Sequence, residues 1–268
     1  MIKFEGRSTW KTTIPGKPIP VGFKAFTLAQ DGYIICWEYT APGILESQDI
    51  SYFEGGIFLS SAGTRVYYKE KGITTDISNT QAAVERLVSI LYQNITSTYS
   101  YHLYIDNLFM NWKLAILFLQ KGIASTGTAR KGACGYPTTL SACKAINTAF
   151  KWGAIQAKEV EKVLALLWQD NNAVQAFTTG YTPLEFVIKE RKRPKKSSTN
   201  ATIARAAFNG SYRRELPVPR AIDDYNHSMG FVDNANQMRA AFTTHTRRNQ
   251  KDFLPRFYWL IDIVLVNY

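Results

Sequence analysis

The chain has 268 residues, of which 46% are hydrophobic and 20% charged, an ordinary composition for a globular protein that can bury a core. Its 32 Lys and Arg against 21 Asp and Glu give a formal net charge of +11, which favours polyanionic partners, nucleic acid first. A merely soluble basic protein is the alternative. The three cysteines argue against a disulfide framework and lack metal-ligand spacing; they are Cys36, Cys134 and Cys143.

The sequence carries no sign of a secretory signal or a membrane span. Its first ten residues lack an apolar core, so an intracellular location is expected. The most apolar stretch, residues 257–268, has 12 residues and contains Asp262, so it is too short to cross a bilayer. It predicts a buried helix that starts near Pro255. Because the chain stops inside this stretch, we expect a fragment of a longer protein.

The N-terminal part alternates strand and helix signals. Residues 21–40 contain two aromatic and β-branched runs around Asp31-Gly32, which predicts a hairpin. Residues 64–70 predict a further strand. A capping box then opens a helix over residues 79–94, where apolar residues recur at helical spacing.

An acidic residue follows directly on the next predicted strand, in the string "HLYIDNLF" that begins at His102. Burying an ionised carboxylate without a partner is costly, so Asp106 should lie at the sheet edge, either paired or bound to a metal. A helix ending at Gly122 and a strand over residues 123–130 come next.

The order of these elements, β-β-β-α-β-α-β, predicts an α/β fold with a mixed sheet, helices on its faces and one main core. Residues 151–180 then predict a hairpin around an Asp-Asn-Asn turn, added to that sheet or to an inserted lobe. Residues 189–201 are rich in Lys and Arg and predict an exposed, mobile loop. From Ala221 a helix is predicted, interrupted by Gly230, with a polar stripe that includes Asp233.

Asp106 and Asp233 are distant in sequence, yet a compact α/β fold can bring such acids together to bind a pair of Mg²⁺ or Mn²⁺ ions. The alternative for each is a solvated or salt-bridged surface acid. The three histidines, His102, His227 and His245, have no zinc-binding spacing. The phosphate-binding glycine motifs and the nucleophile-elbow serine are missing, so no nucleotide cofactor is expected.

The basic residues form two clusters that could contact DNA phosphates. The dense cluster also fits a nuclear localisation signal, or simply a solvated loop. The looser cluster surrounds His245. The predicted DNA-binding residues are Lys189, Arg191, Lys192, Arg193, Lys195, Lys196, Arg247 and Arg248.

Four strings follow one another in the order seen in piggyBac-type transposases, and the chain resembles the catalytic domain of that family, especially piggyBac-derived proteins of fungi. The strings are "HLYIDNLF", "KGIASTGTAR", "YNHSMGFVDNANQMR" and "FYWLIDIVLVNY". The resemblance implies an RNase H-like fold with an inserted β-rich, basic segment before the last catalytic helix. It divides the chain into residues 1–150 and 216–268 of the catalytic core and an insertion over residues 151–215.

The resemblance also implies an acidic triad that binds two divalent metals, Mg²⁺ or Mn²⁺, and cuts and joins DNA. Asp106 matches the second family aspartate and Asp233 the third. At the first position this chain has Gln30, with Asp31 one place later, and such a shift turns a strand side chain to the opposite face. Asn236 replaces an acid that is common in the family.

Two hypotheses follow from these matches. The first is a DNA transposase catalytic domain, with Asp31, Asp106 and Asp233 as catalytic metal ligands, whose enzymatic activity depends on a working triad. The second is a catalytically inactive, domesticated module that keeps the fold and binds DNA or a protein partner. The expected partner is DNA, with a homodimer allowed; neither a membrane nor a nucleotide cofactor is expected, and the expected location is the nucleus.

Overall fold

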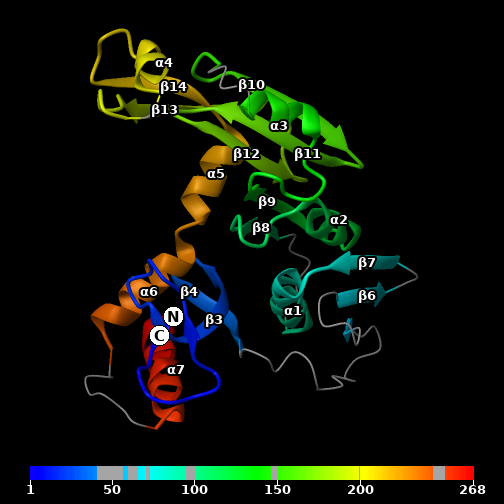
Figure 1. The fold of residues 1–268 in the computed structure, drawn as a ribbon, viewed down its shortest axis with the longest axis vertical. Helices are drawn as coiled ribbons and strands as arrows, with labels where there is room; N and C mark the ends of the chain where they lie inside the picture. The colour runs from blue at the N-terminus through cyan, green and yellow to red at the C-terminus, as the bar shows by residue number, and fades with distance from the viewer. Residues whose placement is uncertain are drawn as a thin grey trace. The chain divides into compact units, whose positions relative to one another are not determined.

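The fold of the chain is seen in a computed structural model, which describes residues 1–40, 57–59, 66–70, 73–94, 101–145, 150–198, 200–243 and 251–268 (Figure 1). The chain forms two compact units. The first comprises Met1–Ser97 and Gly230–Tyr268, and the second Thr98–Met229. Each unit has its own hydrophobic core, so the expectation of one main core is wrong. The three predicted segments are a different division of the chain and stay a prediction.

The first unit is built on the predicted hairpin. Strands β3 (Val21–Gln30) and β4 (Tyr33–Thr40) pair antiparallel, and the short strands β1 (Ile2–Lys3) and β2 (Thr12–Thr13) pair with β3. In the turn, Asp31 has φ 48° and Gly32 has φ 88°. Two positive φ angles in a two-residue turn are what the twist of a hairpin favours, which confirms the signal of the Asp-Gly pair.

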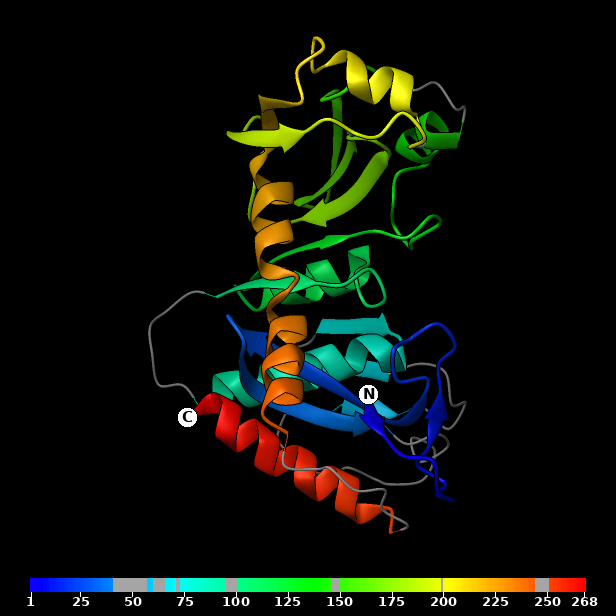
Figure 2. The ribbon, with the colours of Figure 1, turned by 90° about the vertical axis from the view of Figure 1, so that its left-hand side faces the viewer.

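Helices cover both faces of this hairpin, which contains a β-bulge. Leu28 pairs with Cys36 and Ala29 with Ile34, so Ile35 is an extra residue. The Cys36 Sγ then donates a hydrogen bond to the Leu87 carbonyl of helix α1 (Asn79–Asn94). On the other face lie α6 (Phe231–Ala241), seen across the blue strands in Figure 2, and α7 (Phe253–Asn267).

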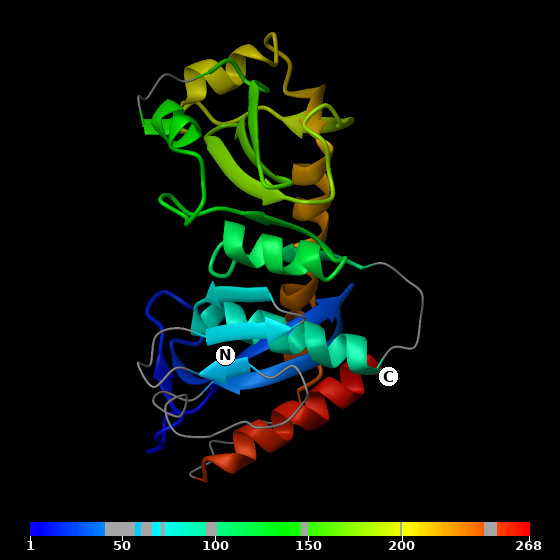
Figure 3. The ribbon, with the colours of Figure 1, turned by 90° about the vertical axis from the view of Figure 1, so that its right-hand side faces the viewer.

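Helix α1 begins and ends where the sequence predicts. The Ser78 backbone N–H donates to Gln81 Oε1 at 2.9 Å, and the Gln81 N–H donates to Ser78 Oγ at 3.4 Å, which is the reciprocal pattern of a capping box. A three-stranded antiparallel sheet lies beside α1 (Figures 1 and 3). It consists of β5 (Ile57–Leu59), β6 (Val66–Glu70) and β7 (Ile73–Ile77), and it includes the strand expected over residues 64–70.

Helix α7 contributes to the core of the first unit with one face only. Trp259 is buried, and its ring lies 5.6 Å from the ring of Trp37, edge to face. Phe253, Phe257 and Val264 are each more than half exposed. The prediction of a helix is confirmed, whereas the expectation that it is buried holds for only one of its faces. No helix in the described part of the chain is both long and apolar enough to cross a membrane.

The second unit contains a mixed sheet, as predicted, with strands in the order β10-β11-β12-β9-β8. The predicted strands that precede α1 lie in other sheets, so the expectation that they share this sheet is wrong. Only β8 (His102–Ile105) and β9 (Ala124–Thr128) run parallel, joined by α2 (Trp112–Gln120). The predicted hairpin is β11 (Val163–Gln169) with β12 (Ala173–Thr178), which joins this same sheet. Strand β10 (Ile155–Val160) and helix α3 (Thr138–Ala145) were not predicted.

An antiparallel ribbon packs on one face of that sheet. Its strands are β13 (Phe186–Lys192) and β14 (Arg213–Pro219), and α4 (Ala201–Ala206) lies between them in the chain. The buried Val218 and Ile222 lie in one core cluster with Leu166 and Trp168. The expectation of a loop over residues 189–201 is therefore wrong for residues 189–192, because cross-strand pairing with β14 outweighs their low strand propensity.

The helix expected from Ala221 consists of two helices. Helix α5 (Arg220–Ser228) ends before Met229 and Gly230, and α6 begins at Phe231. The two helices belong to different units. The apolar residues that predicted one helix therefore lie on two helices, and each helix packs within its own unit.

Candidate active site

Asp106 lies at the carboxyl end of β8, directly after the last paired residue of that strand. Its side chain is exposed, and its Oδ1 accepts a hydrogen bond from the Asn107 N–H at 2.6 Å. Its carbonyl accepts from the N–H groups of Phe109 and Met110, both at 3.0 Å, so the chain turns immediately after the acid. Within the described residues no cation pairs with this carboxylate. The acid is therefore open to solvent and to a metal.

The register between β8 and β9 fixes which side of the sheet this acid occupies. Ile105 pairs with Gly127, so Asp106 follows on the same side as Tyr104 and next to Thr128. A Cβ on Gly127 would lie only 2.3 Å from the Ile105 carbonyl oxygen. Only glycine allows this close approach, and it holds the end of β8 against β9.

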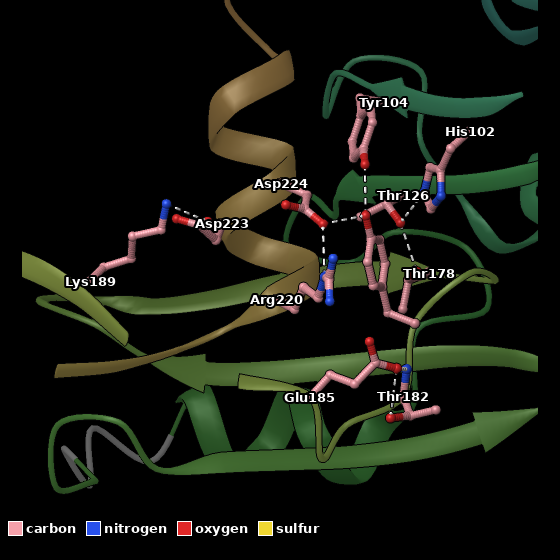
Figure 4. A network of polar contacts seen from close by, with 11 residues as sticks. His102, Tyr104, Thr126, Thr178, Thr182, Glu185, Lys189, Arg220, Asp223 and Asp224 are labelled. Atoms are coloured by element: carbon pink, nitrogen blue, oxygen red, sulfur yellow. Dashed lines mark hydrogen bonds and ion pairs between the residues drawn. The ribbon is translucent and has the colours of Figure 1, made fainter. Parts of the chain in front are cut away.

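A row of hydroxyl groups crosses three neighbouring strands of this sheet (Figure 4). Tyr104, Thr126 and Thr178 are register partners on β8, β9 and β12. The two threonine Oγ1 atoms lie 2.7 Å apart, and His102 Nε2 lies 2.8 Å from Thr126 Oγ1. Burial lowers the pKa of His102, which favours the neutral ring. His102 is thus a hydrogen-bonded structural residue, as its place in an apolar strand suggested.

Helix α5 contacts this row of hydroxyl groups through a chain of hydrogen bonds. The Tyr181 hydroxyl donates to Asp224 Oδ2 at 2.7 Å, and the Tyr104 hydroxyl lies 2.7 Å from the Tyr181 oxygen. Since Tyr181 has a single proton, Tyr104 is the donor in that second bond. Arg220 Nε lies 3.5 Å from the same carboxylate oxygen (Figure 4). Burial, followed by these hydrogen bonds, raises the pKa of Tyr181.

Tyr225 joins α5 to the end of β9. Its hydroxyl lies 3.1 Å from Thr128 Oγ1. Burial raises the pKa of Tyr225, and the negative charge of Asp106 adds to that increase. The Tyr225 hydroxyl therefore stays protonated where it meets Thr128. Tyr225 is not among the predicted site residues, although it stands in the string "YNHSMGFVD"; only the packing of α5 brings its hydroxyl to Thr128.

Asp233 lies in the first turn of α6, in the first unit. Its side chain is exposed and, in the described part, makes no hydrogen bond or ion pair. The positive end of the helix dipole stabilises a carboxylate at this position. Asn236 and Gln237 follow on the same side of the helix, so the predicted polar stripe is present as a solvent-facing surface.

Asp31 occupies the first turn position of the β3–β4 hairpin and is also exposed. The turn contacts α6 through Met238, whose Sδ would lie 3.2 Å from a Cβ on Gly32. Met238 comes five residues after Asp233, roughly 7.5 Å along the helix and about 140° around it. The contact that anchors the turn is thus on a different side of α6 from Asp233. Gln30, the last residue of β3, is exposed as well.

The three acids have the right chemistry for Mg²⁺ or Mn²⁺, which bind carboxylate oxygens. Among the described residues, however, no group of three or more His, Cys, Asp and Glu side chains is close enough to share one ion. An exposed acid without a cationic partner is also not distinctive, since Glu159, Glu161 and Glu215 share that property across the described ranges. What distinguishes Asp106 is its place at the end of a parallel strand pair.

The predicted DNA-binding residues fall into different environments. Lys189 Nζ lies 2.9 Å from Asp223 Oδ2 (Figure 4), and Arg191 lies 2.6 Å from Asp170. Lys192, Lys195 and Lys196 are exposed, and the guanidinium of Arg193 donates to the Gly210 carbonyl. Two further predicted residues lie outside the described residues; they are Arg247 and Arg248.

A family model described as Transposase IS4 matches residues 1–267 of the chain, and the chain therefore belongs to this transposase family. Its fold is also that of piggyBac transposase. The similarity is to a chain in the cryo-EM structure of the piggyBac transposase synaptic complex with hairpin DNA, with a TM-score of 0.63 and 16% sequence identity. The match covers 98% of this chain and 43% of the other, so this chain spans less than half the length of that relative.

Proposed function

We propose that this chain is the catalytic domain of a piggyBac-like DNA transposase that cuts and joins DNA strands by two-metal phosphoryl transfer. The observation that carries the proposal is the open carboxylate of Asp106 at the carboxyl end of β8, in a chain of the transposase family. In this proposal the parallel pair β8–β9 with its α2 crossover is part of an RNase H-like sheet. The ribbon β13–β14 belongs to the inserted segment.

Asp106 and Asp233 are the proposed metal ligands, with Asp31 as the third. Bound Mg²⁺ or Mn²⁺ would activate the attacking hydroxyl and stabilise the leaving oxygen. The carboxylates supply the hard oxygen ligands that these ions prefer. The protonated hydroxyl of Tyr225 can donate a hydrogen bond beside Asp106, which orients either that carboxylate or a phosphate oxygen.

The proposed substrate is DNA, which the chain's net charge of +11 attracts. The basic residues of the ribbon are the proposed phosphate contacts in the second unit. A nuclear location follows from such a substrate, and a fluorescent fusion would check it. A homodimer is also proposed, and size-exclusion chromatography with light scattering would test it.

The test is cleavage of labelled transposon-end DNA in Mg²⁺ or Mn²⁺. Asp106→Asn and Asp233→Asn should each lower the rate by about 100-fold or more, since residues that merely orient a metal ligand are worth roughly 10- to 100-fold. Glu159→Gln, another exposed acid of the second unit, is the matched control and should cleave like the wild type. Full activity of Asp106→Asn would contradict the proposal. Salt-sensitive DNA binding by a wild type that never cleaves would instead identify a non-catalytic binding module.

A further inference from the structure

The end of the β13–β14 ribbon carries a concentration of positive charge in a segment that itself contains no acid. Residues 192–214 contain seven cationic side chains and no Asp or Glu. We name this segment the cationic tip. It includes the last residue of β13, the connection that contains α4, and the first residues of β14. Its cations are Lys192, Arg193, Lys195, Lys196, Arg205, Arg213 and Arg214.

The strand register places like charges opposite one another where the ribbon meets the tip. Arg191 pairs with Arg214, and Lys192 pairs with Arg213. Like charges directly across a ribbon destabilise it. Of these four, Arg191 has the Asp170 carboxylate at 2.6 Å, so the uncompensated repulsion lies between Lys192 and Arg213. Arg213 has the Glu190 carboxylate at 2.6 Å, but both partners are more than half exposed, and exposed pairs contribute little. A bound polyanion would relieve this repulsion.

Three arginines of the tip are held in place by main-chain carbonyls. Arg193 donates to Gly210, Arg205 to Pro194 and Arg214 to Ala207. A carbonyl fixes the position of a guanidinium but leaves its full positive charge, unlike a carboxylate. These contacts therefore prepare fixed cations without neutralising them, which lowers the ordering cost of binding phosphates.

Tyr212 places an aromatic ring among these cations. The ring is 57% exposed, and Lys192 Nζ lies 5.2 Å from its centroid. A hydrogen bond from Lys192 lowers the pKa of Tyr212. The backbone carbonyl of Tyr212 accepts from the Arg193 N–H at 2.8 Å, which fixes the main chain that bears the ring. Aromatic rings beside phosphate-binding cations are what proteins use to stack unpaired bases.

We propose that the cationic tip binds single-stranded DNA, with Tyr212 stacked on an unpaired base and Lys192, Lys195, Lys196 and Arg213 on the neighbouring phosphates. Bases inside a duplex are already stacked on one another, so they offer no face to this ring. The partner is thus a strand whose bases are open, of the kind that strand cleavage exposes. The inference rests on the proposed function for its choice of DNA.

The test is fluorescence anisotropy of the full chain with a labelled single-stranded oligonucleotide and with a duplex. Tyr212→Ala should weaken single-strand binding about 5- to 100-fold, as loss of one stacked base does, and leave duplex binding within about twofold. Tyr212→Phe should bind like the wild type. Tyr33→Ala, which removes another exposed tyrosine ring, is the matched control. Equal single-strand affinity of Tyr212→Ala and the wild type would overturn the proposal, as would equal losses on both DNAs.

The phosphate contacts are tested by salt dependence. The double variant Lys195→Gln with Lys196→Gln should reduce the slope of log affinity against log salt by about 1.4, the value for two phosphates of a single strand. An unchanged slope would show that these two lysines do not contact phosphates. Displacement of the oligonucleotide by polyglutamate at equal charge would identify a general acidic partner and overturn the choice of DNA.

The failure of this inference is distinguishable from failure of the proposed function. Glu159→Gln, at an exposed acid outside both the tip and the proposed metal site, should bind the single strand like the wild type. Cleavage by the wild type together with unchanged binding by Tyr212→Ala would overturn only the proposal for the cationic tip. Tyr212-dependent binding in a wild type that never cleaves would support the tip and contradict the catalytic proposal.

Discussion

The hydroxyl of Tyr181 donates a hydrogen bond to Asp224 across 2.7 Å, and this bond joins the segment after β12 to α5. Tyr104 on β8 completes the chain of hydroxyls, so one carboxylate on α5 orders the strand that ends at Asp106.

Tyr181→Phe should lower the free energy of unfolding by about 1–2 kcal/mol, because Asp224 and Tyr104 each lose a partner in a half-buried place. Urea denaturation followed by circular dichroism measures this change. Tyr33→Phe, at an exposed ring, is the control and should stay within about 0.5 kcal/mol of the wild type. A Tyr181→Phe protein as stable as that control would show that the hydroxyl chain contributes nothing.

Gly127→Ala should destabilise the second unit by about 2 kcal/mol or more, since its Cβ would meet the Ile105 carbonyl at 2.3 Å. Gly230→Ala, in the string that also contains Asp233, has open space within 4 Å and no positive φ, and it should be tolerated. Thermal unfolding of both variants compares the two glycines directly. Similar melting temperatures would contradict the close approach of β8 and β9.

His102 should make stability depend on pH. Burial lowers its pKa in the folded protein, so the unfolded chain binds a proton first as the pH falls below about 6.5. The stabilisation is then present above that pH and is lost as the pH falls through the folded value. His102→Asn should reduce this slope, measured by urea denaturation from pH 7.5 to 5. An equal slope in both proteins would refute the linkage.

The buried Asp262 on α7 should be among the most sensitive positions of the first unit. Its carboxylate lies 3.5 Å from Arg239 and accepts a hydrogen bond from Thr243 Oγ1 at 2.8 Å. Asp262→Ala would leave the largely buried guanidinium unpaired and should cost about 3 kcal/mol or more. Adding Arg239→Met to that variant should restore part of the loss. A double variant less stable than Asp262→Ala would argue against the ion pair as the cause.

Substitutions at Gln30 and Asp31 can show which of the two positions must carry the acid. If Asp31 is the first metal ligand, Asp31→Asn should lose cleavage and Gln30→Asp should leave it unchanged. Cleavage that rises on Gln30→Asp would show instead that the acid is needed at position 30. Circular dichroism of both variants should match the wild type, because both side chains are exposed.

Local signals predicted the hairpin at Asp31-Gly32 and the helix capped by Ser78 and Gln81, because both depend on residues adjacent in the chain. The ribbon was missed because β13 has charged residues on both of its faces, so it lacks the alternation of apolar and polar residues that marks a strand. Its partner β14 also comes about 20 residues later in the chain. The interruption at Gly230 was predicted, but the division of α5 and α6 between two units was not, because their apolar residues continue one helical spacing. In each case the deciding contact is distant in sequence.

For the candidate site, the sequence identified Asp106 as an acid at a strand end, and its exposure agrees. The residues around it could not be predicted. Thr126 and Thr178 become neighbours of Tyr104 only through the pairing of three strands, and Tyr225 reaches Thr128 only through the packing of α5. The roles of Asp31 and Asp233 stay predictions that the cleavage experiments address.

The extra residue Ile35 in β4 makes the hairpin sensitive to length rather than to side-chain identity. It allows Ile34, Trp37 and Tyr39 to face α7 while Cys36 and Glu38 face α1, an arrangement that strict alternation forbids. Substituting Ile35 changes one half-buried side chain, whereas deleting it reverses one half of the strand relative to the other. Among related sequences, the residue type at position 35 should therefore vary freely, whereas insertions and deletions at this position should be absent.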